Sequence, residues 1–223
     1  ADLFESTAAE NIGAMILGVA LYPVFGWKGI IFPLVTGAAG IISSIVGLMF
    51  VKADDDTDNP MSALYKGYFV TSILNLIFLF FIIKSMFSGT LASGESIHYI
   101  DRKIRRVLFR SMYLYLCAVA GIALSYLFVV ITDYYTSYKY RPVKSIAKAS
   151  QTGAATNIIS GISVGMESTA LPVLSVSLAI FASYNLGKLA LPGVANGGLY
   201  GIAVATIGML STCAYILAMD TFG

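Results

Sequence analysis

Residues 61–87 read MSALYKGYFVTSILNLIFLFFIIKSMF, and this long apolar stretch decides the fold class. Its only charged side chains are Lys66 near the start and Lys84 near the end. A helix that crosses the hydrocarbon core of a bilayer needs about 20 largely apolar residues. The stretch therefore predicts a transmembrane helix over residues 61–87.

Five further segments meet the same length and hydropathy requirement. With the first they cover residues 1–22, 30–51, 61–87, 107–133, 154–185 and 197–219. Turn residues or charges separate them, as in the acidic stretch that ends at Asn59-Pro60. We expect an all-α polytopic membrane protein in which residues 1–223 form a single transmembrane helical region. Six crossings would put both ends of the chain on one face of the membrane.

The composition agrees with lipid as the solvent and excludes several functions. Hydrophobic residues make up 57%, charged residues 12%, and the mean hydropathy is +0.80. A net charge of +2 without a basic run interleaved with aromatics argues against nucleic-acid binding. Cys117 and Cys213 both lie in apolar segments and do not indicate a redox compartment. Because His98 is the only histidine, neither a histidine metal cluster nor a Ser-His-Asp triad is expected, and no metal site is assigned to these residues.

Both ends of the sequence predict that it is an internal piece of a longer protein. It has no initiator methionine, no basic leader region and no cleavage site, and acidic residues precede the first apolar run. At the other end, Thr221-Phe222-Gly223 directly follows an apolar helix.

The first candidate site lies at the start of the chain. Asp2, Glu5 and Ser6 are three and four residues apart, which places them on one face of a helix. Two carboxylates and a hydroxyl could hold Na⁺ or share a proton. Equally, the acids could only stabilise a helix N-terminus. Glu10 lies about 140° round the helix from Glu5, on a different face, and is a separate question.

A second candidate is a polar stripe in the segment 154–185. Thr156, Ser160, Ser163 and Glu167 follow the spacing i, i+4, i+7, i+11 and should line one helix face. Acids at membrane depth mark ion pathways or bind neighbouring helices. For Glu167 an interhelical partner is favoured over a transport role. Asp220, near the end of the last segment, could be an ordinary interfacial acid.

Glycines spaced for close helix packing recur in the last two segments. They are Gly161 and Gly165 in one, and Gly197, Gly201 and Gly208 in the other.

Four stretches of the sequence resemble the membrane-integral pyrophosphatases, which couple pyrophosphate hydrolysis to ion export. They are ADLFES (1–6), NPMSALYKGYFVTS (59–72), ITDYYTSYKYRPVKSIAKASQTGAATNIISGISVGMESTALPVL (131–174) and IGMLSTCAYILAMDTFG (207–223). The resemblance covers essentially the whole chain. It implies helices six to eleven of a sixteen-helix subunit that forms a homodimer, with the first and last of these helices in the inner ring around the site.

The resemblance also implies roles for individual residues. Asp2 matches the gate aspartate, Ser6 the serine beside it, and Glu5 a glutamate found in sodium pumps and in part of the proton pumps. Plant-type proton pumps carry that glutamate one turn later, where this chain has Ala9. Asp220 resembles the substrate-side acid at the cytoplasmic end of helix eleven.

Several properties are expected from the resemblance alone. The substrate would be pyrophosphate held by Mg²⁺, and the motifs that bind both lie outside this chain, so the catalytic residues are unknown. The loops of Asp54 and Lys139 would be cytoplasmic, although lysine and arginine are slightly more numerous on the opposite face, eight against six. We expect an integral protein of a prokaryotic cell inner membrane.

The sequence leaves three hypotheses open for function. The leading one is a K⁺-dependent, Na⁺-translocating pyrophosphatase, or a relative that pumps Na⁺ and H⁺ or H⁺ alone. The alternative is a secondary transporter or channel that uses the same carboxylates without hydrolysis. The third is a purely structural helical bundle.

Overall fold

The computed structural model describes residues 2–52, 60–87 and 100–222. For residues 2–4, 60, 100–109 and 220–222 it describes the backbone alone. His98 and the Asp54 loop lie outside the described residues. The helices are α1 (Asp2–Ala20), α2 (Tyr22–Phe25), α3 (Trp27–Leu48), α4 (Pro60–Phe87), α5 (Ile100–Thr136), α6 (Arg141–Ser150), α7 (Ala154–Ser168), α8 (Ala170–Ala190), α9 (Gly197–Leu210) and α10 (Cys213–Phe222).

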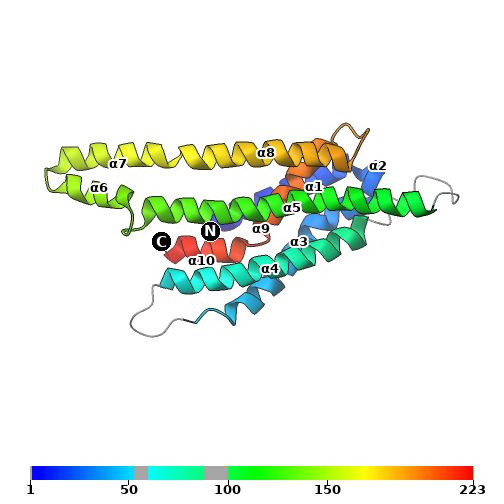
Figure 1. Cartoon of the computed structure of the whole chain (residues 1–223), viewed down its shortest axis with the longest axis horizontal. Helices are drawn as coiled ribbons and strands as arrows, with labels where there is room; N and C mark the ends of the chain where they lie inside the picture. Colours follow the sequence, from blue (N-terminus) through cyan, green and yellow to red (C-terminus); the bar gives the residue numbers. More distant parts are fainter. Residues whose placement is uncertain (1, 53–59, 88–99, 223) are drawn as a thin grey trace.

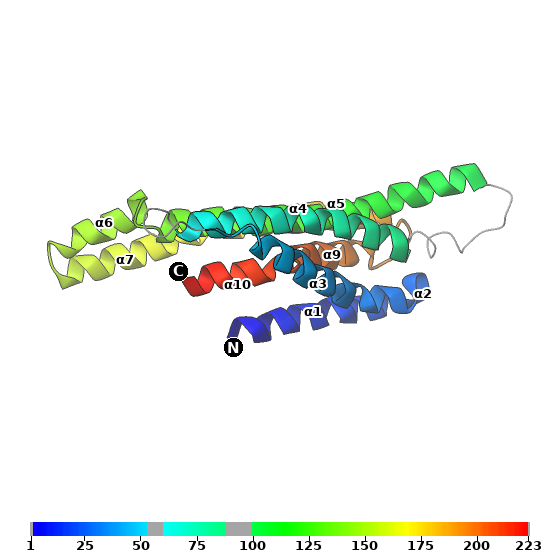
Figure 2. The ribbon, with the colours of Figure 1, turned by 90° about the horizontal axis from the view of Figure 1, so that it is seen from below.

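The long helices run roughly along one direction, as an all-α membrane bundle requires (Figure 1). α5 packs against α8 and α9, and α3 packs against α1 and α4. α6 and α7 extend beyond the other helices at one end of the bundle, and both termini lie toward that end (Figures 1 and 2). The bundle thus has a distinct end where α10 finishes and α1 begins.

An aromatic cluster holds the opposite end of the bundle together. Phe25 of α2 lies 4.7 Å from Phe87 of α4 and 5.3 Å from Tyr200 of α9, measured between ring centroids. Phe32 of α3 contacts Phe87 at 5.2 Å. All four side chains are at most 1% exposed, so they form the centre of the main apolar core.

In the described part of the chain, four helical stretches are long and apolar enough to cross a membrane. They are Trp27–Leu48, Met61–Phe87, Arg110–Ser150 and Ala154–Ala190, and the bent pair α9 and α10 makes a fifth if it is one span. Six crossings would require α1 to span as well.

Glycines allow α9 to approach its neighbours closely. A Cβ atom at Gly201 would collide with the Ser183 carbonyl of α8, and one at Gly208 with the Ala118 carbonyl of α5. The close packing expected of these glycines is therefore confirmed. For Gly161 and Gly165 it stays a prediction, because no atom of the described residues lies within 4 Å of the position of a Cβ at either one.

The expected loop between residues 137 and 153 contains the helix α6. Pro142 occupies the first turn, where its missing N–H is not needed for helical hydrogen bonds. The charges in this segment had favoured a loop, but they lie on exposed positions while Pro142 is buried. The segment is thus an amphipathic helix rather than a loop.

The segment expected as one helix over residues 197–219 is two helices. α9 ends at Leu210 and α10 begins at Cys213, with a bend of 54° between them. The hydroxyls of Ser211 and Thr212 donate hydrogen bonds to the carbonyls of Gly208 and Met209, at 2.7 and 3.0 Å. Such back-bonding bends helices.

Other boundaries shift by a few residues. The segment expected to end at residue 185 continues to Ala190 and is interrupted at Thr169, between α7 and α8. Gly187 lies inside α8, where its missing side chain lets the helix approach Gly197 closely: a Cβ there would lie 2.5 Å from the Gly197 carbonyl oxygen. Gly26, with φ of 59°, makes the turn between α2 and α3.

Candidate functional site

The acidic start of the chain forms the first turns of α1. The backbone is helical from Asp2 onward, so the spacing that puts Asp2, Glu5 and Ser6 on one face applies to it. Glu5 and Ser6 are exposed on the described part of the molecule. The side chain of Asp2 lies outside the described residues. Both described side chains are therefore accessible to helices that would pack on this face.

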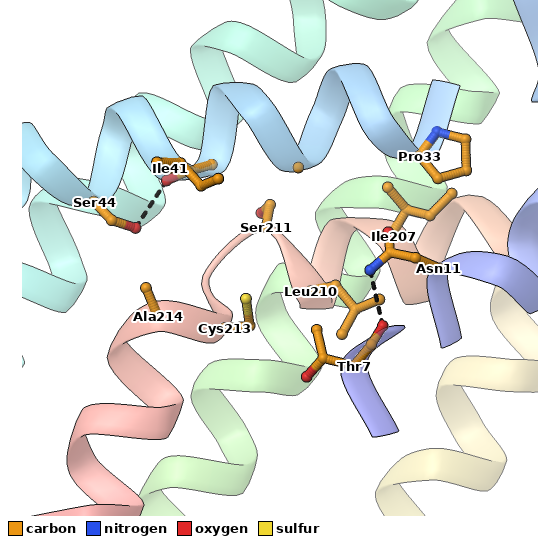
Figure 3. Close-up of a pocket in the computed structure, with 12 residues that line it drawn as sticks. Thr7, Asn11, Pro33, Ile41, Ser44, Ile207, Leu210, Ser211, Cys213 and Ala214 are labelled. Atoms are coloured by element: carbon orange, nitrogen blue, oxygen red, sulfur yellow. Dashed lines mark hydrogen bonds between the residues drawn. The ribbon is translucent and has the colours of Figure 1, made fainter. Parts of the chain in front are cut away.

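One turn further, α1 borders a cavity of about 200 Å³ (Figure 3). Thr7 and Asn11 line it from α1, Ser44 from α3, and Ser211 and Cys213 from the region of the break between α9 and α10. Asn11 donates a hydrogen bond to the Thr7 carbonyl at 2.9 Å, and the Ser44 hydroxyl donates to the Gly40 carbonyl at 2.8 Å. The cavity thus lies between α1, which carries the gate candidates Asp2, Glu5 and Ser6, and the break between α9 and α10.

Side chains of two other helices surround the break. Asn75 of α4 donates a hydrogen bond to the Ser211 carbonyl at 2.8 Å, and both residues are buried. The hydroxyls of Thr212 and Ser125 of α5 lie 3.0 Å apart, and Ser125 is in turn 2.7 Å from the hydroxyl of Tyr68 of α4. A buried polar network therefore joins α4, α5 and the break.

The sequence reasoning above did not select Tyr68, Asn75 or Ser125. A signal was present, since Tyr68, Thr71 and Asn75 recur on one face of an otherwise apolar helix, and each is at most 1% exposed. Polar groups buried among apolar helices must find partners, and this predicts an interhelical network.

The polar stripe of α7 lines a second cavity, of about 510 Å³. All four of its residues, Thr156, Ser160, Ser163 and Glu167, face this space together with Tyr134 of α5 and residues of α6, which include Arg141. The prediction that the stripe shares one face is therefore confirmed, while its role stays a prediction.

Two members of the stripe contact neighbouring residues. Glu167 lies close to the hydroxyl of Tyr135 on α5 and interacts with it electrostatically, an interhelical contact. The Thr156 hydroxyl lies 2.7 Å from that of Thr152 and donates to the Ala149 carbonyl at 3.0 Å, so it ties the start of α7 to the end of α6.

Asp220 belongs to the helical backbone of α10, and its side chain lies outside the described residues. Among the side chains that the structure describes, no group of three His, Cys, Asp or Glu residues is placed to hold a metal ion.

A sequence model of one protein family, described as inorganic H⁺ pyrophosphatase, matches residues 1–223. The chain belongs to this family. The match extends from the acidic start of α1 to the end of α10, so it includes the gate candidates and the helix break. The family and the apolar helices agree in placing the chain in a membrane.

Several curated relatives resemble the chain over its full length. One, from Caldanaerobacter subterraneus subsp. tengcongensis, is named a K(+)-insensitive pyrophosphate-energized proton pump and is 62% identical over 223 residues. Another, from Moorella thermoacetica, is K(+)-insensitive pyrophosphate-energized proton pump 2, 61% identical over 224 residues. Pyrophosphate-energized membrane proton pump 3 of Arabidopsis thaliana is 40% identical over 237 residues.

These alignments take in 100% of this chain but 30%, 30% and 28% of the three relatives. The chain thus spans about 30% of the length of the curated relatives it matches. The first two relatives are bacterial, which agrees with the expected prokaryotic cell inner membrane.

Proposed function

We propose that the chain is part of an ion-translocating membrane pyrophosphatase that uses the hydrolysis of inorganic pyrophosphate to pump protons. The observation that carries this proposal is the match over the full chain, at 62% and 61% identity, to two relatives named pyrophosphate-energized proton pumps. The hydrolysis would be metal-assisted phosphoryl transfer, in which charge on the phosphoryl oxygens is neutralised as water attacks.

The same relatives decide which of the ion hypotheses we favour. They are named K(+)-insensitive, which supports a pump that does not require K⁺ and speaks against the K⁺ dependence in the leading hypothesis from the sequence. Their names specify protons, so we propose H⁺ rather than Na⁺ as the transported ion. Glu5 suits either ion, because a carboxylate can bind a proton or ligate Na⁺.

Within this chain we propose Asp2, Glu5 and Ser6 as the ion gate. Glu5 would take up the transported proton, while Asp2 and the Ser6 hydroxyl would orient it and control its release. Support comes from the helical backbone of α1 through all three positions and from the exposure of Glu5 and Ser6 toward the space that further helices would fill.

Asp220 would lie on the substrate side of the same ring of helices. Both α1 and α10 have these acids toward the same end of the bundle (Figures 1 and 2). Glu167 is assigned a structural role, because its carboxylate contacts Tyr135 of a neighbouring helix. Of the acids whose side chains the structure describes, Glu5 is the one that we propose carries the ion.

Mg²⁺ is proposed as the cofactor of the whole protein, since the negative charge on the pyrophosphate oxygens must be neutralised during hydrolysis. The described residues do not fit a magnesium site, because they contain no cluster of acidic ligands. We therefore place no Mg²⁺ ligand on the described part of this chain and assign no step of the ion's chemistry to it.

A homodimer is proposed from the family resemblance and supported by the outer face of α8. This helix exposes large apolar side chains on the described part of the molecule, namely Leu171, Val173, Leu174, Leu178, Ile180 and Phe181. Such a face must be covered by lipid, by further helices of the subunit or by a second subunit. A dimer would cover part of it.

The test uses the full-length protein in sealed proteoliposomes supplied with Mg²⁺ and pyrophosphate. We expect phosphate release together with acidification of the lumen, without Na⁺ and unchanged by K⁺. Uptake of labelled Na⁺ without acidification would show that the transported ion is Na⁺ and not H⁺. Absence of phosphate release from well-folded protein would favour the secondary transporter.

A further inference from the structure

The break between α9 and α10 is held from outside by a buried side chain of α4. The Asn75 amide donates to the Ser211 carbonyl across 2.8 Å, and Asn75 is 1% exposed. A helix break frees backbone carbonyls, which in apolar surroundings need a partner from elsewhere in the protein. Asn75 supplies that partner from a position 136 residues away in the sequence.

The second residue of the break is held from α5. The Thr212 hydroxyl is paired with Ser125 at 3.0 Å, and Ser125 with Tyr68 at 2.7 Å. All three are at most 1% exposed. We call Tyr68, Asn75 and Ser125 the helix-break clamp.

The hydroxyls of Ser211 and Thr212 and the Ser211 carbonyl all have partners within the protein. The Ser211 hydroxyl donates to the Gly208 carbonyl at 2.7 Å, in addition to the contact of its own carbonyl with Asn75. An ion site would instead need oxygens left available for the ion. The arrangement therefore favours a fixed hold on the two helices rather than a binding site at the break.

We propose that Asn75 is a positioning residue that fixes the direction of α10 relative to α9 and thereby places Asp220 for substrate binding. The bend of 54° is stabilised by a contact to each residue of the break. α10 extends from this point toward Asp220, so a change of angle at the break displaces that acid. The role of Asp220 rests on the proposed function, whereas the hold on the break does not.

The test compares Asn75→Leu with Ser72→Ala in the full-length protein. Leucine keeps the number and branching of the side-chain heavy atoms, with somewhat larger terminal groups, and removes the donor to Ser211. Ser72 lies on the same helix, and its hydroxyl only donates to the Tyr68 carbonyl of that helix, at 2.8 Å. Two readouts are made: the KM and kcat for Mg-pyrophosphate, and the rate at which N-ethylmaleimide labels Cys213, measured by mass spectrometry on the peptide that carries it.

Cys213 reports directly on the break, because it is the first residue of α10 and lines the cavity beside α1. In Asn75→Leu we expect labelling of Cys213 to accelerate about fivefold or more. We expect KM to rise about tenfold while kcat stays within about a factor of two, the pattern of weakened substrate binding. Ser72→Ala should match wild type in both readouts.

An unchanged labelling rate would show that Asn75 does not hold the break and would overturn the proposal. Faster labelling of Cys213 with an unchanged KM would show that Asn75 holds the break but does not place Asp220 for substrate binding. If wild type does not hydrolyse pyrophosphate, the proposed function fails and that role with it, yet labelling still decides whether Asn75 holds the break. Should Asn75→Leu fail to fold, Ser125→Ala removes a smaller group and should change both readouts in the same direction, by about threefold.

Discussion

Gly40 of α3 lies against the backbone of Ser211, so close that a Cβ atom at Gly40 would be 2.6 Å from the Ser211 carbonyl oxygen. That oxygen is the one that accepts the hydrogen bond from Asn75. α3 and α4 therefore enclose the break in α9–α10 together, one by close backbone approach and the other by a donor.

Gly40→Ala should therefore destabilise the protein. The added methyl group must push α3 away from Ser211, and overpacking of this kind costs about 1–3 kcal/mol. The matched control is Gly37→Ala on the same helix, where no atom of the described structure lies within 4 Å of a Cβ. Thermal unfolding of the purified protein, followed by size-exclusion chromatography after heating, measures both. Equal midpoints for the two variants would contradict the close approach of Gly40.

Tyr68→Phe should lower stability by removing one hydroxyl from the clamp. The Tyr68 hydroxyl is paired with Ser125 at 2.7 Å in a buried setting, and the loss of such a hydrogen bond costs about 0.5–1.5 kcal/mol. Tyr126, which stacks on Tyr68 with ring centroids 6.3 Å apart, is exposed, so Tyr126→Phe is the control. We expect a lower unfolding midpoint for Tyr68→Phe alone. A larger drop of the unfolding midpoint in Tyr126→Phe than in Tyr68→Phe would contradict a stabilising hydrogen bond from the Tyr68 hydroxyl.

The helical segments were predictable because lipid imposes a simple rule on length and hydropathy. The stretch 61–87 corresponds to α4, Pro60–Phe87, within one residue. The break at Ser211 and Thr212 was not predictable, because local sequence is compatible with a continuous helix there. Besides the local contacts of the Ser211 and Thr212 hydroxyls, partners distant in sequence, Asn75 and Ser125, hold the break open.

For the candidate site, the spacing of residues in the sequence was sufficient to predict a shared face where one helix supplies all the residues. Thr156, Ser160, Ser163 and Glu167 face one cavity as their intervals predict. Spacing could not reveal that Glu167 contacts Tyr135, since the contact depends on how α7 and α5 pack. It also could not reveal α6, whose charged residues resemble a solvated loop until the buried side of the helix is known.

Glu167→Gln and Tyr135→Phe should each lower stability modestly, and the double variant should be little worse than either. The two groups interact directly across helices, so their effects share one contact and are not additive. The free energies of unfolding of the three variants and wild type give the interaction energy between the two groups.

The same Glu167 variants also separate structure from transport. Acidification per phosphate released should remain at the wild-type ratio in proteoliposomes that contain Glu167→Gln. If that ratio falls while the unfolding midpoint is unchanged, the carboxylate serves transport and the structural assignment of Glu167 is wrong.

Glu5→Ala should abolish proton pumping or uncouple it from hydrolysis. A carboxylate at this position is proposed to carry the ion, and alanine can neither bind a proton nor ligate a cation. Glu10→Gln is the control on the same helix, because Glu10 lies about 140° round from Glu5 and should leave pumping intact. Phosphate release and lumen acidification are measured in the same vesicles, so that loss of coupling is distinguished from loss of hydrolysis. Normal acidification in Glu5→Ala would remove Glu5 from the mechanism. Loss of coupling in Glu10→Gln alone would move the proton carrier to the other face of α1.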